Sequence, residues 1–218
     1  TLAIDRLREV FALPFVGVVP ALKPAVENTA SGAVVLLATA ATVDRDYIDD
    51  LWSAFGHPRR LIKVACAELV GLAEDKLRGR AVSADQLELV LRAVEVKCSH
   101  LLGVHSGSKQ ESEKISAFVL GCTHFPLLRD ELERAWPQPC SWFDSGAAIA
   151  QRVLSIVNSP AFEVHQQPLS DCAERSGISN QWWCTSNKVD ADLSRVLMEY
   201  GLVAAGQLPA AGKGRPAA

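Results

Sequence analysis

The sequence predicts an α/β protein in which most strands are parallel. Segments such as AVVLLA at residues 33–38 are apolar throughout instead of alternating, which is typical of strands that are covered on both faces. Segments in which apolar residues recur with helical spacing separate these runs. A regular alternation of strands and helices indicates crossover connections, which join parallel strands.

Strands and helices are expected in the following order. Strands are predicted at residues 15–19, 33–38, 61–65, 117–120 and 141–143, and in QWWCT at 181–185. Helices are predicted near the start (Leu2, Ile4, Leu7, Val10 and Phe11 at helical spacing), through Ile48 to Phe55, at 68–77, from Ala84 to about Cys98, after Pro126, at 147–157 and at 190–200.

Local signals mark several of these boundaries. Gly56 and Pro58 are expected to end the helix before them, and Gly201 closes the last one. Ser83 and Gln86 have the spacing of a capping box. Two polar or flexible stretches, residues 105–116 and the tail 206–218, are expected to be a surface loop and a disordered tail.

Composition excludes several function classes. The chain of 218 residues has a net charge of -3, so no basic field predicts a nucleic-acid partner. No apolar run approaches the roughly 18 residues of a membrane span, so no membrane partner is expected. The six cysteines include no C-x-x-C pair, which favours a reduced, cytoplasmic protein.

Candidate site residues follow the predicted strands. Ligands bind at the carboxyl ends of strands in open parallel sheets. Residues 33–38 are followed by Thr39 and Thr42, and residues 117–120 by Cys122, Thr123 and His124. On spacing alone Thr42 is better explained as a helix cap. Glu74 is better explained as a surface charge.

Cys122 is the strongest of these candidates. Gly121 would let the backbone approach a ligand, and Pro126 suits the first turn of a helix. The free N–H groups at a helix start favour a thiolate and could hold a carboxylate. His124 could orient the thiol or exchange a proton with it. The alternative is that Cys122 is a small buried side chain and His124 a core histidine.

Other chemistries fail on spacing. Cys98, His100 and His105 lack a partner cluster, so we expect no metal site. A phosphatase loop needs arginine where Leu128 stands.

VLGCTHFPLL at residues 119–128 closely resembles the signature around the second catalytic cysteine of bacterial glutamate racemases, within the aspartate/glutamate racemase family. LPFVGVVPALKPA, LLATAATVDRDYIDDL, CAELVGLAE, FDSGAAIAQRV and QWWCTSN are also similar to segments of this family. The resemblance therefore covers nearly the whole chain.

The resemblance implies interconversion of L- and D-glutamate without a cofactor, supplying D-glutamate for peptidoglycan. Two cysteines act on opposite faces of the substrate α-carbon, and Cys122 corresponds to one of them. Thr123 and His124 would line the substrate, with His124 assisting Cys122. Thr39, Thr42 and Glu74 would help to bind the substrate. The implied partner is a small acid, and a homodimer is possible.

The family's domain plan implies two Rossmann-like lobes with the site between them. We expect residues 1–14 to be a remnant of the first lobe, 15–125 the second lobe and 126–205 the returning part of the first. The family's C-N-T-A motif and early D-S-G motif are not in this sequence, and Thr1 follows the expected position of the former. We therefore expect an incomplete first lobe with exposed apolar faces and an inactive chain. Asp144 and Ser145 match a later family segment, so they receive no catalytic role.

Two alternatives remain open at this point. The chain could be a non-catalytic module that binds a carboxylate, or a related two-cysteine enzyme that acts on aspartate or a hydantoin.

Overall fold

The computed structural model describes residues 3–55, 58–103, 114–159, 181–184 and 190–207. Gly56, which we expected to end a helix, residues 105–113 of the predicted surface loop and the tail from residue 208 lie outside this range. No helix in the described ranges is long and apolar enough to cross a membrane.

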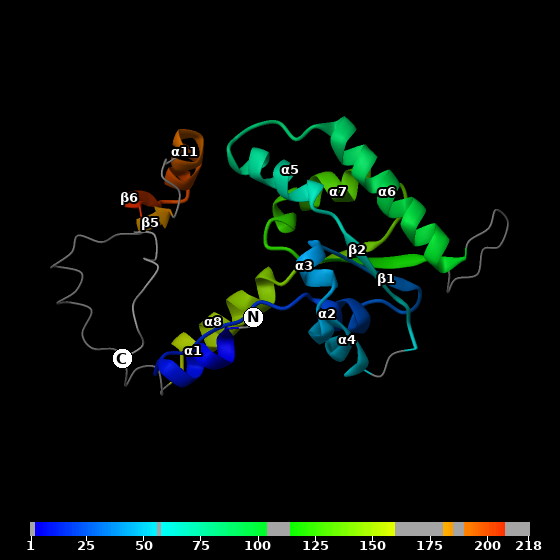
Figure 1. The fold of residues 1–218 in the computed structure, drawn as a ribbon, viewed down its shortest axis with the longest axis horizontal. Coiled ribbons are helices and arrows are strands. Elements are labelled where there is room, and N and C mark those ends of the chain that lie inside the picture. Colours follow the sequence, from blue (N-terminus) through cyan, green and yellow to red (C-terminus); the bar gives the residue numbers. More distant parts are fainter. Residues whose placement is uncertain (1–2, 56–57, 104–113, 160–180, 185–189, 208–218) are drawn as a thin grey trace, which may run out of the picture.

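The centre of the molecule is a parallel sheet of four strands (Figure 1). The strands are β1 (Ala33–Ala38), β2 (Leu61–Ala65), β3 (Ile115–Leu120) and β4 (Ser141–Phe143), in the spatial order β2-β1-β3-β4. Each of them was expected from its apolar run. Every residue of β1 is buried because β1 has neighbouring strands on both edges and helices on both faces.

Three short helices cover one face of this sheet. They are α2 (Leu22–Glu27), α3 (Ala40–Val43) and α4 (Asp46–Ser53). Val34, Leu36 and Ala38 of β1 point to this face and pack against buried residues of the three helices. Ile48 of α4 is buried and Leu51, Trp52 and Phe55 pack around it, so the predicted apolar face of this helix is confirmed.

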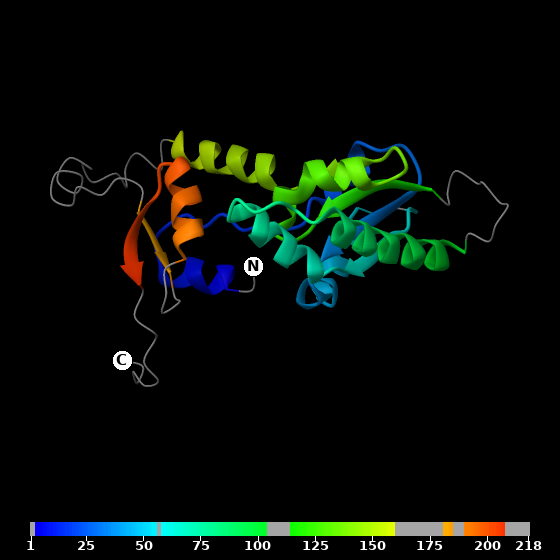
Figure 2. The ribbon, with the colours of Figure 1, turned by 90° about the horizontal axis from the view of Figure 1, so that it is seen from above.

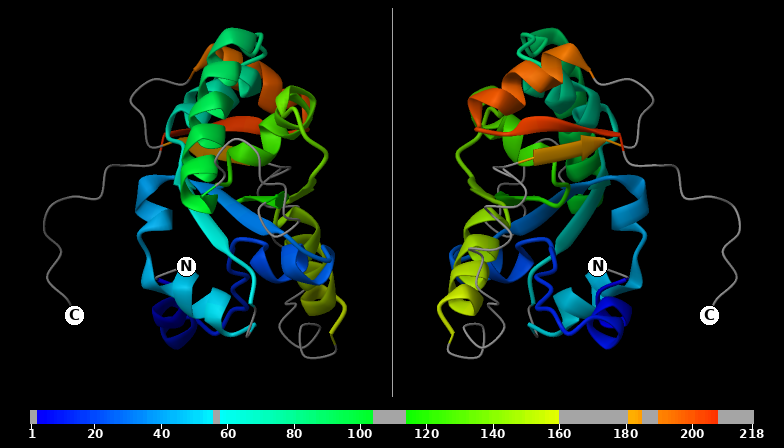
Figure 3. Two further views of the ribbon diagram at one scale, coloured as in Figure 1. Left: turned by 90° about the vertical axis from the view of Figure 1, so that its right-hand side faces the viewer. Right: turned by 90° about the vertical axis from the view of Figure 1, so that its left-hand side faces the viewer.

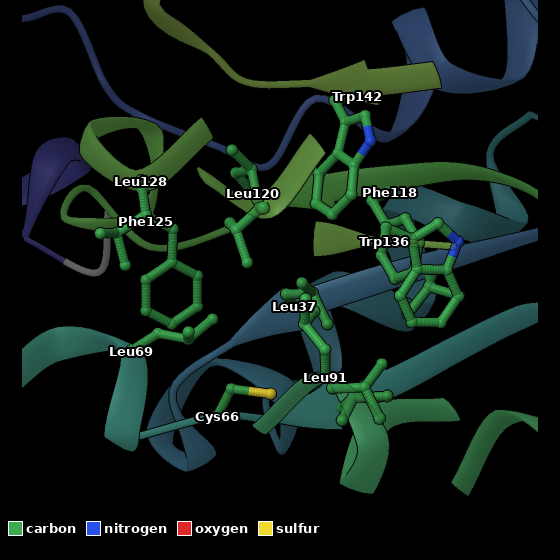
Figure 4. Packing of buried hydrophobic residues seen from close by; sticks show 14 of the residues in the cluster. Leu37, Cys66, Leu69, Leu91, Phe118, Leu120, Phe125, Leu128, Trp136 and Trp142 are labelled. Atoms are coloured by element: carbon green, nitrogen blue, oxygen red, sulfur yellow. The ribbon is translucent and has the colours of Figure 1, made fainter. Parts of the chain in front are cut away.

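The opposite face carries the larger part of the core. It is covered by α5 (Glu68–Leu77), α6 (Ala84–Leu102), a 3-10 turn η2 (Phe125–Leu128) and α7 (Arg129–Ala135). Phe118 stacks on Trp142 with ring centroids 4.4 Å apart and meets Trp136 edge-on at 4.7 Å. Figure 4 shows these rings beside Leu91 and Leu37. In α7, Leu132 is buried in this core and Ala135 is exposed.

The predicted helix signals hold where they can be seen. Ser83 Oγ accepts a hydrogen bond from the Gln86 N–H at 3.3 Å, which caps α6. The helix runs one turn beyond Cys98 and ends at Gly103, whose φ of 71° is left-handed. Pro126 lies in the first turn after Cys122, as expected, although that turn is 3-10.

We call β1–β4 with α2–α7 and η2 the sheet body. The boundary that we expected between residues 125 and 126 falls inside it, because β4 pairs with β3 and Leu128 and Leu132 join the same core. Helices α1 (Ile4–Val10) and α8 (Gly146–Val157) follow a different pattern. Figure 2 shows α8 continuing away from the sheet, and neither helix has a buried residue.

The predicted strand at residues 15–19 is not found. The segment is extended between α1 and α8, and Val18 and Val19 are 42% and 43% exposed. Its carbonyls meet side chains instead of a neighbouring strand: Arg8 donates to the Phe15 carbonyl at 3.0 Å, and Ser145 Oγ donates to that of Val19. An apolar run forms a strand only where another strand offers an unpaired edge to it.

The C-terminal unit consists of β5 (Gln181–Cys184), α11 (Ala191–Glu199) and β6 (Val203–Gln207). β5 and β6 pair in parallel, with α11 connecting them (Figure 3). β5 and α11 were predicted, and Gly201 closes α11 with a φ of 75°. β6 was not predicted. It takes in Gly206 and Gln207, the first two residues of the stretch that we expected to be disordered.

Candidate active site at the ends of β1 and β3

The order of strands identifies one edge of the sheet as the place for a site. From β1 the chain moves outward to β2 and then crosses back over β1 to form β3. Connections therefore leave β1 and β3 in opposite directions, and the crevice at the carboxyl ends of such strands is where open α/β sheets bind ligands. Thr39 follows β1 there, and Cys122 follows β3.

Gly121 brings these two strand ends together. Its N–H donates to the Leu37 carbonyl at 2.8 Å. A Cβ at this position would lie 2.6 Å from Leu36 Cδ1 and 3.2 Å from Ala38 Cβ. The sequence led us to expect that Gly121 makes room for a ligand. Instead it makes room for β1.

Cys122 and His124 lie against each other. The Cys122 Sγ is 3.8 Å from His124 Nδ1, both residues are partly buried, and Thr123 between them is exposed. The turn after them is the 3-10 helix η2, with α7 starting only at Arg129. The α-helix start that we expected to favour a thiolate is thus one turn further away, and His124 is the nearest polar partner.

Glu74 belongs to the same site. Its Oε1 is 3.7 Å from His124 Nε2, so His124 has the thiol on one ring nitrogen and a carboxylate on the other. Glu74 Oε2 accepts a hydrogen bond from Arg78 at 3.0 Å. Spacing alone assigned Glu74 to the surface, whereas α5 places it beside His124.

Arg78 and Asp190 extend this set of contacts and were not predicted. Arg78 Nε donates to Asp190 Oδ2 at 2.7 Å, and this hydrogen bond is the main reason why the pKa of Asp190 is lowered. Arg78, the C-cap of α5, stands four residues after Glu74, a spacing that could have revealed the pair. Asp190 lies 112 residues further along the chain, and no local pattern connects it to Arg78.

The two threonines meet at the end of β1. Thr39 Oγ1 and Thr42 Oγ1 are 3.3 Å apart and share a hydrogen bond. Thr42 does not cap the next helix, because the residue before α4 is Arg45. Both hydroxyls therefore stay near the switch point between β1 and β3.

Three of the other described cysteines are held as thiols by burial. Burial raises the pKa of Cys66 to about 11 and the pKa of Cys98 and Cys140 to about 12. These three groups keep their protons at neutral pH and are poor bases. Cys122 is the described cysteine with a partly exposed thiol beside a histidine.

The remaining candidates have structural explanations. Cys98 lies on the buried face of α6, His100 is exposed, and His105 lies outside the described residues. Within the described ranges, no group of three or more His, Cys, Asp or Glu residues could hold a metal ion. Asp144 accepts from the Gly146 N–H at 2.8 Å and pairs with Arg129 at 3.1 Å, so it organises the start of α8.

A separate groove of about 570 Å³ lies between α1, the extended segment and α8. Its walls are mainly apolar and include Val16, Pro20 and Ile149. Three cationic residues line it: Arg8, Lys23 and Arg152.

Comparison with known proteins identifies relatives over most of the chain. A glutamate racemase of Salmonella enteritidis is 40% identical over 210 residues, which cover 96% of this chain and 66% of that protein. A glutamate racemase of Klebsiella pneumoniae is 38% identical over the same shares. The chain thus spans just under two thirds of the length of these relatives. No family model matches the sequence.

Solved structures agree with the sequence relatives. A crystal structure of Escherichia coli glutamate racemase in complex with L-glutamate and the activator UDP-MurNAc-Ala has a TM-score of 0.74 and 36% identity, over 95% of this chain and 70% of that one. A Bacillus anthracis glutamate racemase, at 17% identity and a TM-score of 0.60 over 92% and 67%, shares the fold. The α/β class with a mostly parallel sheet is thereby confirmed, and the chain belongs to the glutamate racemase family.

Proposed function

We propose that this chain takes part in the interconversion of L- and D-glutamate without a cofactor, and that Cys122 moves the proton at the substrate α-carbon. The observation that carries this proposal is the contact of 3.8 Å between Cys122 Sγ and His124 Nδ1 at the switch point of the sheet. A thiol suits the task because both of its forms are accessible near neutral pH.

The two contacts of His124 determine which of its ring nitrogens accepts the proton of the Cys122 thiol. With the Nε2–H facing Glu74, Nδ1 is left as the acceptor that faces the thiol. His124 can then take the thiol proton, and Glu74 stabilises the charged ring. The resulting thiolate removes the α-proton of glutamate. In the two-cysteine mechanism a second thiol returns a proton from the opposite face.

The substrate is a small dicarboxylic acid. The E. coli relative was crystallised in complex with L-glutamate. In this chain the hydroxyls of Thr39 and Thr42 after β1 and of the exposed Thr123 after β3 supply hydrogen-bonding groups at the ends of these two strands. We infer that they hold the substrate's carboxylate and amino groups, and that the D-glutamate produced serves peptidoglycan synthesis.

Exchange of the α-proton tests the role of Cys122 directly. The chain is incubated in D₂O with L-glutamate or D-glutamate, and loss of the α-proton signal is followed by NMR. We expect exchange of one enantiomer without racemisation, slowed at least about 100-fold in Cys122→Ala, because general acid–base groups contribute roughly that much. Cys140→Ala is the matched control: its thiol holds its proton, so exchange should stay within about twofold of the unchanged chain.

Each other outcome assigns a different function. Exchange of aspartate but not glutamate would identify a related racemase. Binding of glutamate without any exchange would identify a non-catalytic carboxylate-binding module. Equal exchange in the unchanged chain and Cys122→Ala would contradict the proposed role of Cys122.

A second ligand is suggested by the groove between α1 and α8. The E. coli relative is described with UDP-MurNAc-Ala as an activator, which carries a diphosphate. We propose that the cationic side chains of Lys23 and Arg152 hold such an anionic nucleotide sugar, with the apolar wall against its less polar parts.

Calorimetric titration with UDP-MurNAc-Ala tests the groove. The double variant Lys23→Gln, Arg152→Gln should bind at least about 10-fold more weakly, because it removes two positive charges from the groove. This factor corresponds to a loss of about 1.4 kcal/mol of binding free energy. Arg92→Gln on the exposed face of α6 is the control. Unchanged affinity in the double variant would exclude the groove as the binding site.

A further inference from the structure

A continuous set of polar contacts connects Cys122 with the start of α11. Its members are joined in the order Cys122, His124, Glu74, Arg78 and Asp190, at 3.8, 3.7, 3.0 and 2.7 Å. Cys122 and His124 belong to the loop after β3, Glu74 to α5, Arg78 to the end of that helix as its C-cap, and Asp190 to the C-terminal unit. The contacts therefore bridge the sheet body and the C-terminal unit.

The two oxygens of Glu74 have different partners. Oε2 accepts the hydrogen bond from Arg78, and Oε1 is the oxygen near His124. A carboxylate held through one oxygen cannot rotate freely, so Arg78 determines where the other oxygen lies. Because Glu74 is partly exposed, its orientation without Arg78 would be set by water.

Asp190 holds Arg78 in a similar way. Its Oδ2 receives Arg78 Nε, while its Oδ1 accepts the N–H groups of Asp192 and Leu193 and so caps α11. One carboxylate oxygen of Asp190 is thus bonded to Arg78 of the sheet body, and the other is bonded to α11 of the C-terminal unit. The guanidinium lies between two carboxylates and donates one hydrogen bond to each, from Nη1 to Glu74 and from Nε to Asp190.

The other charged groups at this end of α5 have their own partners. Lys76 pairs with Glu131 of α7 at 2.8 Å, and Arg80 pairs with Asp75 at 3.0 Å and with Asp192 at 3.7 Å. The contact between Glu74 and His124 is therefore the one through which the charged groups of α5 act on the imidazole ring, as far as the described residues show.

We propose that Arg78 and Asp190 are positioning residues of the Cys122 site: they fix Glu74 against His124 and thereby make proton transfer at Cys122 depend on docking of α11. The inference rests on the proposed function, which makes Cys122 the group that moves the proton. It adds the C-terminal unit as the part of the chain that orients the histidine.

The experiment compares two charge-removing variants on one helix. Asp190→Asn keeps an oxygen that can cap α11 but loses the ion pair with Arg78. Asp192→Asn removes the same charge from the same helix and leaves the set of contacts intact. Arg78→Met removes the other member of the pair, and circular dichroism and hydrogen exchange of α11 show whether each variant keeps its fold.

The first measurement is the rate at which iodoacetamide alkylates Cys122 as a function of pH, followed on the Cys122 peptide by mass spectrometry. If the orientation of Glu74 matters, Asp190→Asn and Arg78→Met both release the Glu74 carboxylate from its position beside His124. Both variants then move the midpoint of the alkylation profile to higher pH by about 0.5 unit, which is about 3-fold in alkylation rate. Asp192→Asn leaves the midpoint within about 0.2 unit.

A simple charge effect gives a different pattern. Removing the negative Asp190 would favour the thiolate and removing the positive Arg78 would disfavour it, so the two midpoints would move in opposite directions. Opposite shifts, or a shift in Asp190→Asn no larger than in Asp192→Asn, would overturn the proposal.

The second measurement is α-proton exchange with glutamate. Asp190→Asn is expected to lower kcat by about 3- to 10-fold with KM within about twofold, since Glu74 would be misplaced only for the proton transfer. Alkylation needs no substrate. If glutamate exchange failed in the unchanged chain, the alkylation profiles would still decide the role of Arg78 and Asp190.

Discussion

The sheet body and the C-terminal unit are stabilised by different forces. In the sheet body β1 is buried along its whole length, and Phe118, Phe125 and Leu132 are fully enclosed. In the C-terminal unit no residue of α11 is buried, and Trp183 and Val203 are about half exposed. Ion pairs of Arg78 and Arg80 with Asp190 and Asp192 link it to α5. Apolar burial thus stabilises the strand ends that carry Cys122. Ion pairs attach α11, the helix that we propose orients the Cys122 site.

The largest expected effect is loss of a buried ring in the sheet body. Phe118→Ala should lower the free energy of unfolding by about 3–5 kcal/mol, because Phe118 packs between Trp136 and Trp142 and the cavity cannot collapse fully. Urea unfolding followed by circular dichroism measures it.

An aromatic residue of the C-terminal unit is the control for this variant. Trp183→Ala removes a larger ring that is 51% exposed, and we expect a cost of about 1 kcal/mol or less. Equal costs for the two variants would show that the C-terminal unit is packed as firmly as the sheet body.

Arg59 should give the next largest effect. This partly buried side chain donates hydrogen bonds to carbonyl and hydroxyl oxygens of Val26, Thr29, Ser31, Gly32 and Ser116. Arg59→Ala leaves several of these acceptors without a partner and should cost about 2–4 kcal/mol. Thermal unfolding gives the value.

The neighbouring Arg60 provides the comparison. It is exposed and donates to the Leu101 carbonyl, so Arg60→Ala should cost about 1 kcal/mol or less. A loss at Arg59 no larger than at Arg60 would mean that water replaces the guanidinium, and that the sheet body depends on apolar contacts alone.

Sequence reasoning succeeded where the signal is local. The strands around Val35 and Phe118 and the cap at Ser83 follow from patterns within a few residues, and so do Cys122 and His124 at a strand end. The segment at residues 15–19 failed because its apolar character cannot tell whether a strand edge is available to it.

Contacts between distant segments were beyond local patterns. Arg59 gathers oxygens from residues 26 to 116, and Arg78 meets an aspartate 112 residues away. The fold creates these neighbours, and a single sequence does not show them. Glu74 is an intermediate case, since family resemblance suggested it and α5 places it beside His124.

The smallest effect is expected from acid, and it should separate the two regions. The hydrogen bond from Arg78 lowers the pKa of Asp190 below its usual 3.8. A carboxyl group whose pKa is lower in the folded than in the unfolded state contributes stability above the unfolded value and loses that contribution as the pH falls through the folded value. Docking of α11 should therefore weaken below about pH 4, while β1 stays protected.

Hydrogen exchange at pH 7 and pH 3, corrected for intrinsic rates, measures this difference. Amides of residues 191–199 should lose protection at low pH, and those of residues 33–38 should keep it. In Asp190→Asn, residues 191–199 should lose clearly less protection between the two pH values, because the carboxyl group that pairs with Arg78 is gone while Asp192 remains. If these residues lost protection with pH as strongly in Asp190→Asn as in the unchanged chain, the ion pair with Arg78 would not be what attaches α11. The proposed dependence of Cys122 on the C-terminal unit would then lose its physical basis.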